Sequence, residues 1–293
     1  MILRTQFTGH FRATTVRSCE NIGWQAKAPA PQKRKPLRTN VGQTLSSVNP
    51  AISVVFSPLL CVALIAAGAL YAQPGAGRGP MIPPIEETGY QPIFDGKSLA
   101  GWEGDARFWR VENGAIVGQT ATDKQPVQNT FLIWRGGSPA DFELKLQFRL
   151  TGYNSGIQFR SIELPDIKFA MKGYQADMDG VQQYTGQIYE ERGRGFLAMR
   201  GQFSYIGEGK KPALVGSVGD SEELKKLIKG DDWNDLHLIA RGNTIIQLLN
   251  GRITSMLIDD DTAGRKLAGL IGIQVHKGPP MKIEARNIRL KKL

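Results

Sequence analysis

Apolar residues at every second position from Phe142 to Leu150 most constrain how this 293-residue chain folds. The positions between them hold charged or amide residues. Because alternate side chains of a β-strand leave opposite faces, this segment is expected to be a strand with one buried face. Further strands are expected at 108–111, 115–117, 130–134, 156–160, 187–190, 236–241, 244–249, 271–276 and 283–290.

Tight turns separate several of these segments. Asn113-Gly114, Gly242-Asn243 and Asn250-Gly251 tolerate the positive φ of short hairpin turns. One segment differs, because Asp220 to Glu223 form a helix-capping pattern that predicts a short helix over 221–229. There is no internal repeat and no βαβ rhythm. The expected fold is all-β, a concanavalin-like jelly-roll sandwich of two antiparallel sheets with one short helix.

The N-terminal part of the chain is organised differently. Residues 1–50 hold eight Lys and Arg and one Glu, so they carry +7 of the total charge of +10. The rest of the chain therefore has no strong positive charge with which to bind a polyanion, and no nucleic-acid partner is expected. Residues 51–72 are uncharged and apolar. They predict a secretory signal cleaved after Ala69 or Ala72, with an uncleaved membrane anchor as the alternative.

These features divide the chain into three parts. A basic leader with the signal peptide (or anchor) spans 1–72, a Pro/Gly-rich linker spans 73–91, and a folded domain spans 92–293. The protein is expected to be exported, to the periplasm or the extracellular space, with membrane attachment only through the apolar segment. Both cysteines, Cys19 and Cys61, lie in the leader, so the domain is expected to have no disulfide and no cysteine nucleophile. The oligomeric state is left open.

Polar side chains concentrate between Tyr174 and Arg194, and this stretch is the predicted functional site. Gln175, Asp177 and Asp179 alternate with small or apolar residues, so all three are expected on one face of a strand. Further along the stretch come Tyr189, Glu190, Glu191 and Arg192. Such a mixture of charges suits a polar ligand. The alternative is a solvated outer sheet face joined by a charged turn.

Several motifs resemble the 3-keto-disaccharide hydrolase family, formerly domain of unknown function 1080. They lie in the family's order at 94–102 (FDGKSLAGW), 109–118, 154–160 (NSGIQFR), 173–179 (GYQADMD), 185–191 (TGQIYEE), 233–251 and 272–293. The resemblance runs from about Pro92 to the C-terminus. It implies a concanavalin-like jelly roll in exported bacterial proteins. It also implies activity on 3-keto-glycosides, as 1,2-lyases and as hydratases of the resulting 3-keto-2-hydroxy-glucal. Ala285 stands where the family usually has an aromatic residue, which concerns packing.

Ordinary retaining glycoside hydrolysis is disfavoured by the residues themselves. Gln175 occupies the position of the nucleophilic glutamate of sandwich glucanases, and an amide cannot attack the anomeric carbon. A 3-keto sugar offers another route, because its C3 carbonyl acidifies the proton at C2. Such a reaction needs a base, a charge stabiliser and a proton donor, but no covalent nucleophile.

Candidate residues for these roles are distributed over the predicted domain. The catalytic candidates are His276, Asp177, Glu191 and Glu190, and the substrate-binding candidates are Asn154, Arg160, Gln175, Asp179, Tyr189 and Arg192. Arg160 and Arg192 are the candidates to hold an enolate. Arg160, Asp177, Glu191 and His276 are expected to meet on the concave side of one sheet. The expected partner is a small carbohydrate, and the alternative function is a non-catalytic carbohydrate-binding module.

Other polar and aromatic residues have structural interpretations. His237 is expected on the solvent side of a strand, and residues 259–261, three aspartates, are expected to form a solvated turn. Trp102, Trp109, Trp134 and Trp233 are predicted to be core residues rather than sugar-stacking platforms. No cofactor or metal is expected. The alternative is a divalent cation such as calcium bound by Asp177 and Asp179, although two carboxylates are fewer ligands than calcium needs for its full coordination shell.

Overall fold

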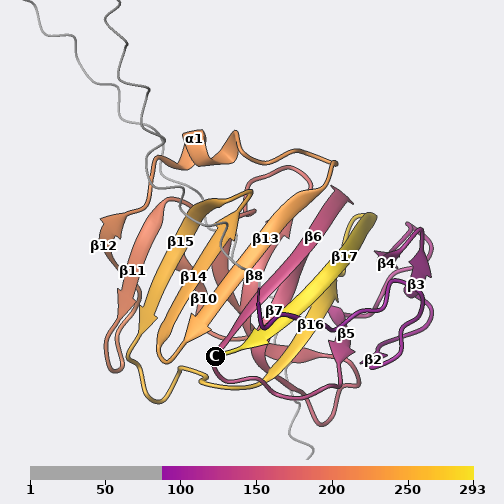
Figure 1. Cartoon of the computed structure of the whole chain (residues 1–293), viewed down its shortest axis with the longest axis horizontal. Coiled ribbons are helices and arrows are strands. Elements are labelled where there is room, and N and C mark those ends of the chain that lie inside the picture. Colours follow the sequence, from indigo (N-terminus) through magenta and orange to yellow (C-terminus); the bar gives the residue numbers. More distant parts are fainter. Residues whose placement is uncertain (1–87) are drawn as a thin grey trace, which may run out of the picture. The chain divides into compact units, whose positions relative to one another are not determined.

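The computed structural model describes residues 88–293, which form two packed β-sheets and one short helix (Figure 1). The larger sheet has the order β12 (Ala213–Ser217), β11 (Gln202–Ile206), β15 (Arg252–Asp259), β14 (Thr244–Leu249), β13 (Asn234–Arg241), β6 (Phe142–Gly152), β17 (Met281–Lys292), β4 (Ala115–Gln119) and β3 (Trp109–Glu112), with β1 (Gln91–Pro92) beside β17. The smaller sheet has the order β10 (Gly195–Ala198), β9 (Gln187–Glu191), β8 (Met171–Asp179), β7 (Asn154–Glu163), β16 (Leu270–Val275), β5 (Thr130–Trp134) and β2 (Trp102–Glu103). The predicted all-β jelly-roll sandwich is confirmed.

Local sequence signals explain most of these elements. The alternation that begins at Phe142 is realised in β6, where apolar residues are buried and their neighbours are half-buried. Asn113 and Gly114 take the predicted positive φ, at 50° and 75°, in the turn between β3 and β4. The helix α1 (Ser221–Lys225) begins after the Asp220 cap but is shorter than predicted. Beyond Lys225 the backbone continues in tighter turns with hydrogen bonds between residues three apart.

The main core lies between the two sheets. Phe142 and Leu144 of β6 pack there with Phe159 of β7 and Tyr174 of β8. Trp102, Trp109 and Trp134 are buried as predicted. Trp233 is half-buried instead, and its ring packs against the guanidinium groups of Arg149 and Arg286 on the larger sheet.

A second, smaller core covers part of the outer face of the seven-stranded sheet. Phe131 and Ile133 of β5 alternate with Leu132, which belongs to the main core, so they point to the opposite face. Phe169 and Met171 pack against them there. This cluster closes one part of the outer face, and the polar residues of β7 and β8 occupy another.

The three aspartates at 259–261 do not form a solvated turn. Asp259 and Asp261 are buried, and both pair with Arg194. Tyr174 also donates a hydrogen bond of 2.5 Å to Asp259. The prediction of a solvated turn was wrong. The aspartates can be buried because Arg194, about 65 residues earlier in the chain, compensates their charge, and the local sequence does not indicate this partner.

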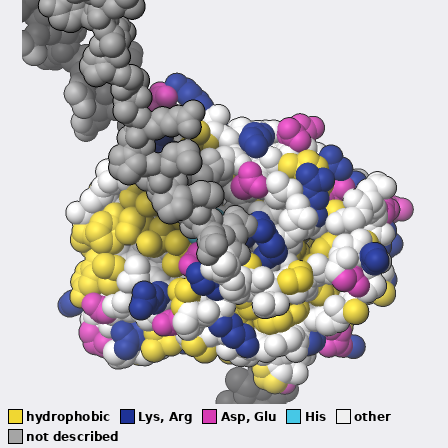
Figure 2. All heavy atoms as spheres, viewed as in Figure 1, with side chains coloured by type: hydrophobic (Ala, Val, Ile, Leu, Met, Phe, Trp, Pro, Cys, Tyr) yellow, Lys and Arg dark blue, Asp and Glu magenta, His cyan; other side chains and the backbone are white. Residues whose placement is uncertain are grey.

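The face of the ten-stranded sheet is the one seen in Figure 2, where hydrophobic side chains gather at the left, over β11 and β12. Leu214 and Val215 of the edge strand β12 are exposed. His237 lies on β13 and is half-buried, with a hydrogen bond of 2.8 Å to Glu143. These residues belong to a different sheet from the predicted site.

The predictions for the N-terminal leader fall outside the described residues. The apolar segment 51–72, and with it the choice between a cleaved signal and an anchor, stays a prediction. In residues 88–293, no helix has the length and apolar character needed to span a membrane.

Candidate functional site

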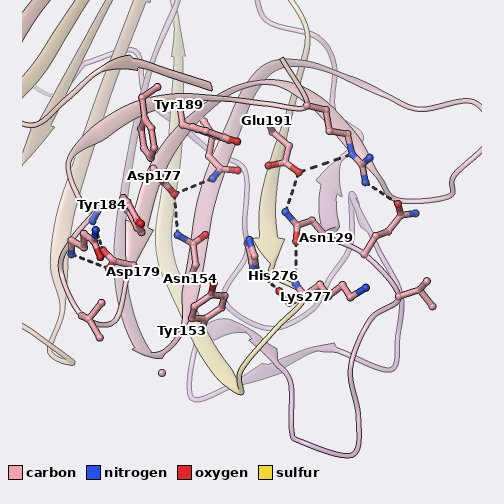
Figure 3. A pocket seen from close by; sticks show the side chains of 18 residues that line it. Asn129, Tyr153, Asn154, Asp177, Asp179, Tyr184, Tyr189, Glu191, His276 and Lys277 are labelled. Carbon is pink, nitrogen blue, oxygen red and sulfur yellow. Dashed lines mark hydrogen bonds and ion pairs between the residues drawn. The ribbon is translucent and has the colours of Figure 1, made fainter. Parts of the chain in front are cut away.

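A cavity of about 780 Å³ opens on the outer face of the seven-stranded sheet. Its floor comes from β7 and β8, where Asn154, Gln175, Asp177 and Asp179 lie on the face opposite the main core. The alternation predicted for β8 is therefore correct. Figure 3 shows Asp177 between Tyr184 on one side and Glu191 on the other.

A network of amide side chains underlies the floor. Gln175 Oε1 accepts hydrogen bonds from Gln158 at 3.2 Å and Gln274 at 3.1 Å, on the strands β7 and β16. Gln175 reaches across β7 because Gly156 has no side chain: a Cβ there would lie 2.4 Å from the Gln175 Cδ. The glycine of the NSGIQFR motif thus allows a buried amide to extend beneath the site.

Asp177 is nearly fully buried in this floor, with 4% of its surface exposed. Its Oδ1 accepts hydrogen bonds from Gln175 Nε2 and the Met178 amide, each at 3.1 Å, and from Asn154 Nδ2 at 3.3 Å. Burial nevertheless raises the pKa of Asp177 to about 7. The charged carboxylate loses more stabilisation by water than it gains from these hydrogen-bond donors. Near neutral pH this carboxyl can therefore both give and take a proton.

Asp179 lines the cavity but is engaged by the turn between β8 and β9. Its carboxylate accepts hydrogen bonds from the amides of Gln183, Tyr184 and Thr185 and from the Thr185 hydroxyl. These bonds fix the turn that carries Tyr184. In residues 88–293, no three His, Cys, Asp or Glu side chains cluster as ligands of a metal ion. The calcium alternative stays a prediction.

The wall formed by β9 carries Tyr189 and Glu191, followed by Arg192. Asn129 Nδ2 donates a hydrogen bond of 3.0 Å to Glu191 Oε1. Burial raises the pKa of Glu191, although this bond opposes the shift. The Arg192 guanidinium donates a hydrogen bond to Gln128 Oε1 at 2.8 Å and lies 4.0 Å from Glu191. These two contacts hold the positive charge of Arg192 at the cavity.

The opposite wall carries His276 and Lys277, directly after β16. His276 Nδ1 lies 2.5 Å from the Lys277 carbonyl oxygen, which only accepts hydrogen bonds. Nδ1 therefore carries the hydrogen, and Nε2 of the neutral ring is left as an acceptor. Burial lowers the pKa of His276, so the ring is neutral at pH 7. The imidazole meets Tyr153 edge-on at 5.1 Å.

Two predicted site residues lie elsewhere. Glu190 points away from the cavity, because its neighbours Tyr189 and Glu191 point into it, and it pairs with Arg194 at 2.6 Å. Arg160 sits at a bulge of β7 with φ of 45° and is 1% exposed. The prediction that it meets the acid and base groups was wrong.

The Arg160 guanidinium is bound by loops at the end of the strand. It donates hydrogen bonds to the carbonyls of Ala140 at 2.9 Å and Gly242 at 2.6 Å, and to the Asp141 carboxylate at 3.0 Å. Because its donors already have protein partners, Arg160 is a structural residue that joins segments of the sandwich.

Sequence reasoning missed several residues of the cavity. These are Val127, Gln128, Asn129, Tyr153, Val181, Gln183, Tyr184, Phe196 and Lys277. Most lie in turns and loops, where no periodic pattern marks the direction of a side chain. The one available signal was the position of Tyr153 and Lys277 directly beside Asn154 and His276, which were predicted.

The match to a family model agrees with a carbohydrate-related protein. Residues 89–291 match the model of a family described as 3-keto-alpha-glucoside-1,2-lyase-like domain. No curated protein matches the chain.

Several solved structures have similar folds, and three bacterial proteins are among them. A candidate glycosyl hydrolase from Parabacteroides distasonis is 18% identical, with a TM-score of 0.47 over 70% of this chain and 94% of that one. A carbohydrate-binding module from Bacillus subtilis is 15% identical, with a TM-score of 0.43 over 66% and 96%. A galectin-like protein from Bacillus subtilis is 12% identical, with a TM-score of 0.46 over 66% and 90%.

Proposed function

Because the chain belongs to the family of 3-keto-alpha-glucoside-1,2-lyase-like domains, we propose that it cleaves 3-keto-glycosides by elimination followed by hydration. The family makes it a carbohydrate-active sandwich protein, and the specific reaction is our proposal. Net hydrolysis would then proceed without a covalent sugar-enzyme intermediate, which fits an amide at Gln175 in place of a nucleophilic carboxylate.

The elimination breaks two bonds of the sugar. A base removes the proton at C2, the electron pair of the C2–H bond forms a C1=C2 double bond, and the C1–O bond to the aglycone breaks. The departing oxygen takes a proton from an acid. In the second step water adds across the double bond, with hydroxide at C1 and a proton at C2, and a free 3-keto sugar results.

One observation carries the proposal: Asp177 and His276 line the same cavity with opposite pKa shifts. A lowered pKa keeps the imidazole neutral and able to take the C2 proton through Nε2. A pKa of about 7 keeps much of the Asp177 carboxyl protonated, ready to donate to the leaving oxygen. In the hydration step Asp177 takes a proton from the attacking water. The His276 imidazolium, whose N–H exchanges with solvent once the aglycone has left, gives a proton to C2, and the pair is restored.

The other polar residues of the cavity have supporting roles in this proposal. Arg192 compensates the negative charge that develops on the C3 oxygen as the enolate forms. Glu191, held by Asn129, accepts hydrogen bonds from sugar hydroxyls, and Asn154 and Tyr189 orient the ring.

The test is release of sugar from 3-keto-trehalose or 3-keto-sucrose by the purified protein. We expect release by the natural protein and its loss in Asp177→Asn and His276→Ala. Full activity in both variants would reject these two roles. Binding of the keto-disaccharides without any release would instead support the second candidate, a non-catalytic carbohydrate-binding module, for which the amide-lined floor would serve equally well.

Export of the protein is proposed separately, from the basic and apolar leader. Expression of the full chain in bacteria, followed by mass analysis of the exported fraction, tests it. An N-terminus near residue 70 or 73 is expected, whereas a protein that keeps residues 51–72 at the membrane would favour the anchor.

A further inference from the structure

The exposed side chains that line the cavity include an apolar group, besides the polar Gln183, Arg192 and Lys277. Val127 is 86% exposed, Val181 72%, Tyr153 42% and Phe196 40%, and all four line the cavity. We call these four side chains the apolar rim. They come from four separate segments, namely the loop before β5, the turn between β8 and β9, the turn between β6 and β7, and the strand β10. Exposed hydrophobic residues that gather around one opening mark a binding surface, whereas scattered ones need no explanation.

Aromatic rings connect the rim to the polar groups below it. Phe196 stacks on Tyr184, with ring centroids 5.5 Å apart and planes at 21°. It also meets Tyr189 edge-on at 5.1 Å, because the two residues are partners across β10 and β9. On the other wall, Tyr153 contacts the His276 ring (Figure 3). An aromatic surface therefore extends outward from both walls of the proposed reaction site.

The rim and the floor suit different parts of a substrate. The amides and carboxylates of the floor match the hydroxyls and carbonyl of a keto sugar. At the rim, the side chains of Val127 and Val181 offer no hydrogen-bond partner to the hydroxyls of a second sugar, so such a sugar gains little from contact with them. An aromatic group placed there would bury apolar area on both partners, which is favourable.

We propose that the apolar rim is a subsite for an aromatic leaving group. The preferred substrates would then be 3-keto-glucosides of phenols or benzylic alcohols rather than of a second sugar. This inference rests on the proposed elimination, in which the aglycone departs from C1 toward the mouth of the cavity as the C1–O bond breaks.

The test compares benzyl 3-keto-glucoside with methyl 3-keto-glucoside, using the purified full chain. Both release an alcohol that needs protonation, so the aromatic ring is the main difference between them. We expect kcat/KM for the benzyl compound to be roughly 10-fold higher or more, as burial of an apolar ring against the rim implies. The value for 3-keto-trehalose should also lie below that for the benzyl compound. A benzyl-to-methyl ratio near one, or a preference for 3-keto-trehalose, would overturn the subsite.

Variants then locate the subsite. Val127→Ser combined with Val181→Ser changes two exposed side chains in a loop and a turn, so folding should be preserved. We expect this double variant to lower the benzyl-to-methyl ratio about 5- to 10-fold. Leu214→Ser is the matched control, because Leu214 is 64% exposed but lies on β12, outside the cavity. An unchanged ratio in the double variant, or an equal fall in the control, would contradict the assignment.

Failure of the reaction itself remains distinguishable from failure of the subsite. If no 3-keto-glycoside is cleaved, the proposed function is rejected. The subsite is then tested only by the affinity of the protein for glucosides with and without an aromatic group. Titration with benzyl α-glucoside and methyl α-glucoside should then give a Kd at least about 5-fold lower for the benzyl compound. Loss of that difference in the double variant would support the subsite, and equal Kd values in the natural protein would reject it.

Discussion

Glu191 accepts a hydrogen bond of 3.0 Å from Asn129, although the strands beside them, β9 and β5, are separated in the sheet by three others. Asn129 Oδ1 also accepts the Lys277 amide at 3.0 Å. One side chain therefore joins the wall that carries Glu191 to the segment that carries His276. The shape of the cavity depends on this contact across the sheet.

Removal of that contact should loosen both walls. We expect Asn129→Ala to lower kcat/KM by about 10- to 100-fold, because small displacements of reacting groups are costly. Both kcat and KM should change, whereas Glu191→Gln should act mainly by raising KM. Steady-state kinetics with a 3-keto-glycoside provide the measurement. Gln128→Ala, which removes only the bond to Arg192, should leave kcat within a few-fold, and unchanged kinetics in Asn129→Ala would reject the positioning role.

The acid role of Asp177 can be tested through the leaving group. Asp177→Asn keeps an oxygen that accepts the three hydrogen bonds of the floor but cannot donate the proton. For alkyl or sugar leaving groups kcat/KM should fall by about 10²- to 10⁴-fold. For 4-nitrophenyl 3-keto-glucoside, whose phenolate leaves without a proton, the loss should be far smaller. Equal losses with both leaving groups would argue against donation by Asp177.

The pH dependence of kcat/KM follows from the two shifts. The base must be deprotonated, so activity should rise as pH passes the lowered pKa of His276, below its ordinary value of 6.5. The acid must be protonated, so activity should fall as pH rises through the pKa of Asp177, about 7. The expected profile is a narrow bell between these limits. With 4-nitrophenyl 3-keto-glucoside, kcat/KM should no longer decrease at alkaline pH, because this leaving group needs no proton. If the decrease remained, it would report a group other than Asp177.

Arg160 and Arg192 form a matched pair for separating structure from binding. Arg160→Met leaves buried carbonyls without a donor and should lower the free energy of unfolding by about 3 kcal/mol. Its KM at 25 °C should stay within about twofold of the natural value, since the residue lies outside the cavity. Arg192→Met should change stability little and raise KM or lower kcat. Denaturant unfolding measures the stability of the two variants, and steady-state kinetics measure their KM and kcat. A raised KM in Arg160→Met without loss of stability would indicate that Arg160 binds substrate after all.

Residue alternation made much of the fold and the floor of the site predictable. It predicted β6 and placed Gln175, Asp177 and Asp179 on one face of β8, as observed. The same rule excludes Glu190 from the face of Glu191, and its inclusion came from proximity in the sequence alone. Periodicity and composition thus identified strands and their polar faces.

Other features depend on contacts that no local pattern contains. The bulge that turns Arg160 into the loops requires a φ of 45°, which the sequence does not signal at an arginine. Asp259 is buried because Arg194 reaches it from a distant turn. Asn129 lies directly before β5 and contacts Glu191 at the end of β9, although three strands separate β5 from β9, so no local pattern indicates the contact.

The most direct measurement of the central claim is the fate of the hydrogen at C2 when cleavage is run in D₂O. The purified protein is incubated with a 3-keto-disaccharide, and the released 3-keto sugar is analysed by mass and NMR, with free 3-keto sugar in D₂O as the exchange control. We expect deuterium at C2 of the product well above the control, because elimination removes that proton and hydration replaces it from solvent. A product that keeps its original hydrogen at C2 would show direct cleavage at C1 and contradict the account.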